Sequence, residues 1–122
     1  MVKIDTREKF HVITIHEPNV AANMTEKMDK VLGSLLDDNV KNVIINMKDI
    51  KIVESAAAEH LAEIQNRFYD TRASFVVCEL QPDIKKELTA SGILDKLNYT
   101  PTESEAMDIV QMEEIEREFG EF

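Results

Sequence analysis

The side chains best placed to carry chemistry gather at the predicted start of one helix. Glu54 and Ser55 precede three alanines, Ala56 to Ala58, and Glu59 follows them. A hydroxyl at a helix N-terminus lies among unpaired N–H groups and a partial positive charge, and phosphorylation there adds about −1.5 to −2 charges. Three small residues at an exposed helix start would suit close docking of a partner. The alternative is that Ser55 only caps its helix, which is worth about 1 kcal/mol.

Other reactive side chains lack the neighbours that catalysis or metal binding needs. His60 and Glu63 lie one helical turn apart, but a zinc site needs three or four ligands and the sequence has no HExxH pattern, so a solvated helix face is expected. Cys78 ends an apolar run with no histidine close in sequence, which predicts a buried thiol. No acid, base and nucleophile set can be assembled. The sequence therefore predicts no enzyme, no cofactor and no metal site.

The sequence predicts four helices, one of which begins at this segment. In the helix that begins near Ser55, four apolar residues recur at i, i+4, i+7 and i+11, a spacing typical of a core-facing helix face: Ala57, Leu61, Ile64 and Phe68. Pro18 and Asn19 are expected to end a strand and open a helix over residues 20–37. Pro82 and Gly92 bracket a short helix. Thr102 and Glu105 form a capping box for an acidic helix over 103–119.

Apolar runs between these helices predict the strands. They cover residues 1–6, 8–16, 42–47 and 74–78, with a short extended piece at 50–53. Strands that alternate with helices are typical of a partly parallel sheet with helices packed on it. We expect a single α/β domain over residues 1–122, with a mixed sheet of four to five strands and about four helices.

The segment from Asn42 to Leu61 resembles the anti-sigma-factor antagonist family, the STAS domains. In that family a strand that often ends in an acid is followed by a short extended stretch. An Asp, two hydroxyl residues and a Gly then open a helix. Here Asn46 stands at the strand acid, and the next four positions are matched in order by Glu54, Ser55, Ala56 and Ala57. The resemblance continues in Leu88–Leu97 and in Thr102–Ala106, so it covers nearly the whole chain.

This resemblance implies a fold and a mode of action. Related antagonists bind a kinase-like anti-sigma factor in their unmodified form, and phosphorylation of the second hydroxyl residue switches them off. Ala56 occupies that position and has no oxygen to phosphorylate. The resemblance therefore implies a bacterial protein that binds constitutively through Glu54, Ser55, Ala56, Ala57 and Glu59. Asn19 and Asn46 are expected near the rim of this surface, and Ser55 stays a candidate phosphorylation site.

Composition narrows the range of partners. The chain has 24 Asp and Glu against 14 Lys and Arg, a net charge of −10, which disfavours nucleic acid and anionic membrane surfaces. Eight of the acids lie in residues 103–122 with only Arg117 to oppose them, so a solvated face is expected there. A single cysteine cannot form an intrachain disulfide. Charged residues interrupt the N-terminus before an apolar run can form, so this segment does not resemble a signal peptide. A cytoplasmic location is predicted.

Three alternatives stay open at this stage. The chain could be a scaffold subunit that binds other STAS proteins, or it could form a homodimer. Phe119 and Phe122, which flank Gly120, could dock onto such a neighbouring subunit. It could instead carry a nucleotide or lipid in a pocket beneath the helix that begins at Ser55. A bound ligand would then raise the melting temperature.

Overall fold

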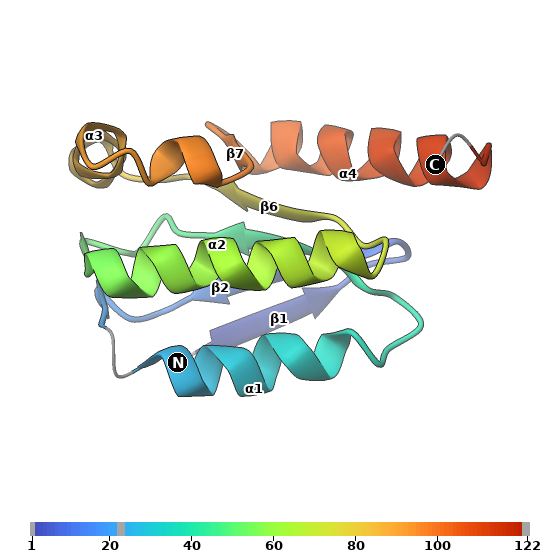
Figure 1. Cartoon of the computed structure of the whole chain (residues 1–122), viewed down its shortest axis with the longest axis horizontal. Coiled ribbons are helices and arrows are strands. Elements are labelled where there is room, and N and C mark those ends of the chain that lie inside the picture. The colour runs from blue at the N-terminus through green and yellow to red at the C-terminus, as the bar shows by residue number, and fades with distance from the viewer. Residues whose placement is uncertain (1, 22–23, 121–122) are drawn as a thin grey trace.

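A mixed sheet forms the centre of the molecule (Figure 1). The computed structural model describes residues 2–21 and 24–120. Within these residues, five strands lie in the order β1-β2-β4-β6-β7. They are β1 (Val2–Thr6), β2 (Phe10–Ile15), β4 (Asn42–Asn46), β6 (Phe75–Cys78) and β7 (Tyr99–Thr100). β1 runs antiparallel to β2, and the other pairs are parallel.

Four α-helices in the described ranges connect or cover these strands. They are α1 (Thr25–Leu35), α2 (Ser55–Asp70), α3 (Pro82–Ala90) and α4 (Glu103–Glu118), with a short 3₁₀ turn, η2 (Leu94–Lys96). Thr102 caps α4, as predicted: its hydroxyl oxygen accepts from the Glu105 N–H at 3.2 Å. Gly92 follows α3 with a left-handed φ of 80°, which a residue with a Cβ rarely adopts. Five strands and four helices confirm the predicted α/β class.

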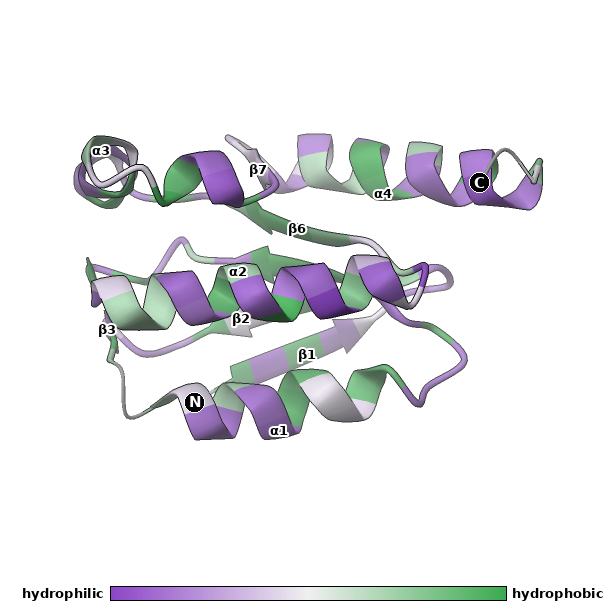
Figure 2. Cartoon of the chain, viewed as in Figure 1, coloured by the Kyte–Doolittle hydropathy of each residue, from purple (hydrophilic) through white to green (hydrophobic). Residues whose placement is uncertain are grey.

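Alternation along the strands gives the sheet two apolar faces. On one face β4 and β6 present Val43, Ile45, Phe75 and Val77, which pack under α1 and α2. On the other face Phe10, Val12, Ile44, Val76 and Cys78 pack against Ala106 and Val110 of α4. In Figure 2 the arrow of β6 is coloured as hydrophobic, and in β4 three apolar residues stand between Asn42 and Asn46. Such continuous apolar runs are typical of strands covered on both sides.

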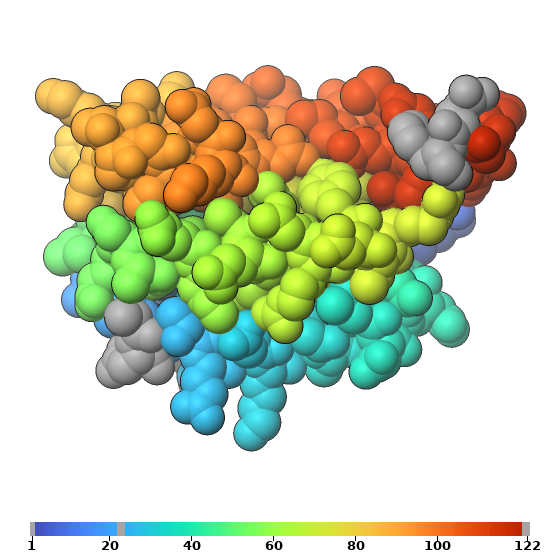
Figure 3. Space-filling view, in the orientation of Figure 1, coloured from blue at the N-terminus to red at the C-terminus, as the bar shows by residue number. Residues whose placement is uncertain are grey.

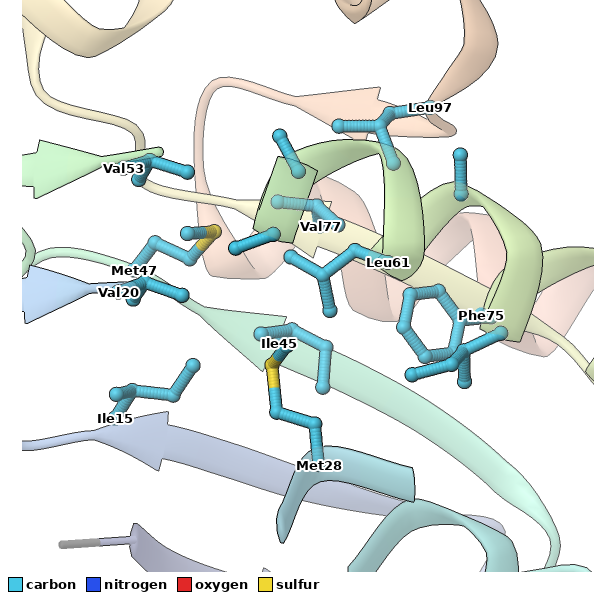
Figure 4. Packing of buried hydrophobic residues seen from close by; sticks show 14 of the residues in the cluster. Ile15, Val20, Met28, Ile45, Met47, Val53, Leu61, Phe75, Val77 and Leu97 are labelled. Atoms are coloured by element: carbon cyan, nitrogen blue, oxygen red, sulfur yellow. The ribbon is translucent and has the colours of Figure 1, made fainter. Parts of the chain in front are cut away.

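The larger core lies between the sheet and the α1–α2 layer. In Figure 4, Leu61 points from α2 toward Ile45 and Val77, and Met28 reaches the same region from α1. Phe68 and Phe75 meet edge to face, with ring centroids 5.2 Å apart. The side chains of α1 and α2 form the surface that Figure 3 shows over this core. This packing fixes the rotation of α2 about its own axis.

The predicted helix over residues 20–37 is wrong at its N-terminal end. Asn19 and Val20 form a short strand, β3 (Asn19–Val20), which pairs in parallel with β5 (Ile52–Val53). Val20 is fully buried in this pair, so this apolar residue belongs to a strand and not to the apolar face of the following helix. Residues 22–23 of the predicted helix lie outside the described residues, and α1 begins at Thr25.

Candidate docking surface at the start of α2

The two short strands β3 and β5 fix the position at which α2 begins. The N–H groups of Lys51 and Ile52 donate to the Pro18 carbonyl oxygen at 2.6 and 2.9 Å. The Glu54 N–H donates to the Val20 carbonyl oxygen at 2.9 Å. Val53, buried beside Val20, anchors this small sheet in the core. Backbone hydrogen bonds to Pro18 and Val20 thus hold residues 51–54, the segment directly before α2, in place.

The first turn of α2 presents Ser55 without using its hydroxyl. Glu54 is the N-cap residue, in an extended conformation, and the helix has no side-chain cap hydrogen bond. Ser55 is the first helical residue, so the interpretation that it caps the helix is wrong. Its side chain is exposed, and its hydroxyl has no bonding partner among residues 2–21 and 24–120. Ala56 beside it is also exposed.

The next two alanines do not belong to the surface. Ala57 and Ala58 are buried in the same cluster as Leu61 and Ile64. The expectation that Ala57 contacts a partner is therefore corrected, because its Cβ faces the protein interior. Of the three alanines that follow Ser55, only Ala56 is available from outside.

Glu59 lies one turn further along α2 and is exposed. Its carboxylate is 3.8 Å from the Lys96 ammonium, with both side chains more than half exposed. An ion pair in such a position contributes about 0–1 kcal/mol, so a partner could separate the two groups at little cost. Glu59 is accessible at the edge of this first turn.

Ile52 is a surface residue that sequence reasoning missed. Its side chain is 56% exposed, and it lies opposite the exposed Asn19 in the β3–β5 pair. The sequence predicts only a short extended piece at 50–53, and of its three apolar residues Ile50 and Val53 are buried whereas Ile52 is not. The α2-start surface therefore consists of an apolar residue, two small first-turn residues and three polar side chains: Ile52, Ser55, Ala56, Asn19, Glu54 and Glu59.

Asn46 lies in the interior and not at a rim. It is 5% exposed, on the sheet face that α4 covers. Its amide donates to a Glu103 carboxylate oxygen at 2.9 Å, and its carbonyl oxygen accepts from the Lys48 N–H at 3.0 Å. Asn46 therefore joins β4 to α4 and has little surface left to offer a partner.

His60 joins two helices. Its Nε2 lies 2.8 Å from an Asp29 carboxylate oxygen of α1, and its Nδ1 lies 3.4 Å from Glu63. The hydrogen bond from His60 holds the pKa of Asp29 below its usual value, and Arg67 at 2.5 Å acts in the same direction. The predicted solvated helix face is thus corrected to a polar clamp between α1 and α2. Within the described ranges, no three His, Cys, Asp or Glu residues come together as a metal site.

Cys78 is a buried thiol, as predicted. Its side chain is fully buried at the end of β6, and burial together with the nearby carboxylates of Glu103 and Glu79 raises its pKa to about 12. A thiol that keeps its proton at neutral pH is a poor nucleophile. Cys78 is therefore part of the core under α4.

The space beneath the start of α2 is filled. Ala57, Ala58 and Leu61 occupy it together with Val20 and Val53. An apolar pocket of about 30 Å³ lies instead between β2 and α1, next to Ile13, Met28 and Leu32. That volume fits about one water molecule. This geometry gives no support to a lipid or nucleotide pocket under α2.

The order of elements and the strand–extension–helix unit that carries the α2-start surface can be compared with known proteins. The family model of the STAS domain matches residues 1–106. The chain belongs to the STAS domain family. No helix in the described part of this STAS domain is both long enough and apolar enough to cross a bilayer.

Solved structures agree with this assignment at the level of the fold. An anti-sigma factor antagonist from Mycobacterium paratuberculosis matches with a TM-score of 0.75 and 14% identity, over 91% of this chain and 93% of that one. RsbS from Moorella thermoacetica matches with a TM-score of 0.72 and 18% identity, over 90% and 94%. The anti-sigma factor antagonist SpoIIAA in its unphosphorylated form matches with a TM-score of 0.70 and 16% identity, over 91% and 96%.

Proposed function

We propose that this STAS domain is a non-enzymatic protein-interaction module of the anti-sigma-factor antagonist type, which binds its partner constitutively through the α2-start surface. The observation that carries the proposal is the pair of exposed residues in the first turn of α2. Ala56 stands where related antagonists carry the phospho-acceptor, and it offers a methyl group in place of a hydroxyl. The usual switch therefore has no atom on which to act.

The shape of the surface supports docking of a protein. Ile52 supplies exposed apolar area, and Ala56 lets a partner approach the first turn closely. Glu54 and Glu59 frame these two residues with negative charge. An apolar centre with a polar rim is the usual arrangement of a protein interface. The partner in this proposal is a kinase-like anti-sigma factor with a basic contact area.

Ser55 remains the one hydroxyl in this turn, one position before the usual acceptor. We infer that it is not a switch, although it is exposed. A phosphate on Ser55 would lie at the positive end of α2, where the first-turn N–H groups stabilise an anion. It would also lie beside Glu54 and close to Glu59, which oppose it. The proposal therefore treats Ser55 as an unmodified contact residue.

The remaining expectations belong to the same proposal. The net charge of −10 favours a basic protein partner over nucleic acid or a membrane surface. The proposal places the protein in the bacterial cytoplasm, as a single domain over residues 1–122. The alternative within the same class is a scaffold subunit that binds other STAS proteins or a second copy of itself.

Affinity capture from the source-cell lysate, followed by mass spectrometry, tests the proposal. Wild type is compared with Glu59→Arg on the α2-start surface and with Glu87→Arg, a matched charge reversal at an exposed position of α3. We expect a kinase-fold anti-sigma factor to be retained by wild type and Glu87→Arg and lost by Glu59→Arg. Intact-mass measurement of the protein from cells should show no phosphate.

Two results would count against the proposal in different ways. Capture of only other STAS proteins, unaffected by Glu59→Arg, would favour the scaffold subunit. Stoichiometric phosphate on Ser55, together with loss of partner binding, would show that a switch exists despite Ala56. Ser55→Ala tests the second result, because it should increase partner binding if a phosphate on Ser55 blocks it, whereas the proposal expects binding close to that of wild type.

A further inference from the structure

The outer face of α4 carries an apolar stripe that covers nothing in the described structure. Met112, Ile115 and Phe119 follow one another at i, i+3 and i+7, so they share one side of the helix. Their side chains are 53%, 52% and 76% exposed. The inner side of the same helix is apolar as well, since Ala106 and Val110 are fully buried against the sheet. α4 is thus apolar on two opposite sides.

The exposed charges that α4 itself carries around this stripe are negative because the single cation of the helix turns inward. The Arg117 guanidinium donates to Ser74 Oγ at 2.8 Å, to Asn42 Oδ1 at 3.1 Å and to the Glu114 carboxylate at 3.2 Å. Its side chain is only 14% exposed. The exposed charges of α4 are therefore all carboxylates: Glu105, Asp108, Glu116 and Glu118. Of these, Glu118 lies 3.7 Å from the Lys9 ammonium in an exposed ion pair.

We propose that the outer stripe of α4, formed by Met112, Ile115 and Phe119, is a docking site for a basic amphipathic helix of a partner protein. An amphipathic helix lays its apolar side on such a stripe by contacts at i, i+3 and i+7. Basic residues that flank its apolar side would meet Glu105 and Glu116 along one edge of the stripe and Asp108 one turn before Met112. Asp108 and Glu116 have no ion-pair partner in the described structure, so they are free to pair.

The charge pattern also decides against a second copy of this chain. Two α4 helices packed stripe to stripe would bring their acidic rims together, with no outward-facing cation on either helix. Like charges placed across an interface cost several kcal/mol. The stripe therefore suits a basic partner and opposes self-association.

This site is separate from the α2-start surface. α4 covers the sheet face formed by Phe10, Ile44 and Val76, whereas α2 covers the opposite face. The sheet lies between the two surfaces. The inference thus goes beyond the proposed function and does not depend on it, and the domain could hold two partners at once.

Two-dimensional NMR with a synthetic probe tests the docking site. The probe is a helical peptide of about three leucine–lysine heptads, and its matched control carries glutamate in place of every lysine. We expect the basic peptide to shift amide signals of residues 105–119 and leave those of residues 54–59 unchanged. The acidic peptide should not bind.

Neutral substitutions then separate stripe contacts from diffuse charge attraction. Ile115→Gln and Phe119→Gln remove apolar area at exposed positions, so the fold should persist, and each is expected to weaken binding at least about tenfold. Ile4→Gln, at a position on β1 that is 45% exposed, is the matched control and should bind as wild type does. Asp108→Lys should weaken binding more than Asp37→Lys, which lies in the loop after α1.

Several results would overturn the inference. These are no binding of the basic peptide, shifts centred on residues 54–59, or equal effects of Ile115→Gln and Ile4→Gln. Sedimentation equilibrium provides one further test. If the wild type is a dimer and Ile115→Gln is a monomer, the stripe binds a second copy of this chain and not a basic partner. Because these measurements use no anti-sigma factor, failure here leaves the proposed function untouched.

Discussion

The amide group of Asn46 connects the end of β4 to the first turn of α4. It donates to Glu103, and the Glu103 N–H in turn donates to the Glu79 carboxylate at 2.8 Å. The sequence resemblance to STAS domains implies that Asn46 stands where the strand often ends in an acid. A carboxylate at position 46 would lie at hydrogen-bond distance from the Glu103 carboxylate and repel it. The neutral Asn46 amide instead donates a hydrogen bond to Glu103.

Asn46→Asp is therefore expected to destabilise the fold by about 1–3 kcal/mol at neutral pH. Two carboxylates at this distance cannot both ionise easily, so the folded pKa of the pair lies above the unfolded value. The loss is then small at low pH and grows as the pH rises from the unfolded pKa toward the folded one. Urea unfolding of wild type and variant at about pH 4 and about pH 7 measures it.

The exposed Asn39 provides the control for this prediction. Asn39→Asp adds the same charge in a solvated loop and should change the stability little at either pH. If Asn46→Asp lost the same amount of stability at both pH values, the repulsion from Glu103 would not be its cause.

At single positions the sequence predicts the site less well than it predicts the pattern around it. The apolar spacing of α2 correctly placed Ala57 with Leu61 and Ile64 on the core side. The family resemblance also placed Ala57 on the docking surface, and the two statements conflict. Packing decides between them, because the rotation of α2 is set by the residues it buries. The exposure of Ile52 could not be predicted in the same way, because a strand of two residues is too short to show a periodic pattern.

Among the elements, Tyr69 of α2 connects helices and strands that are far apart in sequence. Its hydroxyl donates to the Glu113 carboxylate of α4 at 2.9 Å and accepts from the Asn98 amide at 2.6 Å. Glu113 also accepts from the Ser74 hydroxyl at 2.6 Å. Burial, and then the charge of Glu113, raises the pKa of Tyr69 to about 12. The acidic last helix is therefore not a wholly solvated face, because Glu113 and Glu114 hold it to the sheet.

Tyr69→Phe should cost about 1–3 kcal/mol at neutral pH, because it leaves the Asn98 amide and part of Glu113 without a partner. It should also change the alkaline limb of the stability curve. A pKa raised in the folded state gives stability that is present below the unfolded value of about 10 and is lost as the pH rises toward about 12. Wild type should lose stability over this window, and Tyr69→Phe should lose less. Urea unfolding across this pH range measures the difference.

Tyrosinate absorbance provides an independent check on the same group. The chain has two tyrosines, and Tyr99→Phe leaves Tyr69 as the only one that titrates. Its ionisation should remain near pH 12 in that variant. Ionisation close to the ordinary value of about 10 would mean that Tyr69 is neither buried nor in contact with Glu113 in solution.

Long, periodic elements were predictable, and so was the extended piece that holds β5, but β3 and its pairing with β5 were not. The four longer strands of the main sheet (β1, β2, β4 and β6) and the helices α2, α3 and α4 each show an apolar pattern or a cap that can be recognised without knowing what the element packs against. β3 and β5 have two residues each, and they exist only because Pro18 and Val20 accept hydrogen bonds from residues 51–54. That pairing spans more than thirty residues along the chain. A pattern among neighbouring residues cannot reveal this pairing, so the sequence predicts Val20 as part of the following helix.

At the scale of the whole molecule, one sheet separates two cores of unequal size. The larger core lies under α1 and α2, and the smaller one is closed by α4 alone. The sequence predicted the sheet and its helices but not which residues of α4 face inward. α4 is apolar on both sides, so its periodicity does not distinguish the buried side from the exposed one. Only the contacts with Phe10, Ile44 and Val76 do so.

A matched pair of substitutions in α4 tests this arrangement of layers. Val110 is fully buried in the smaller core, whereas Met112 lies on the outer side and is half exposed. Both Val110→Asp and Met112→Asp add one negative charge to the same helix, so their difference isolates burial. We expect Val110→Asp to lower the free energy of unfolding by at least about 3 kcal/mol, because an unpaired carboxylate would face apolar side chains. Met112→Asp should change it by no more than about 0.5 kcal/mol. Equal losses in urea unfolding would mean that α4 does not close the second core in this orientation.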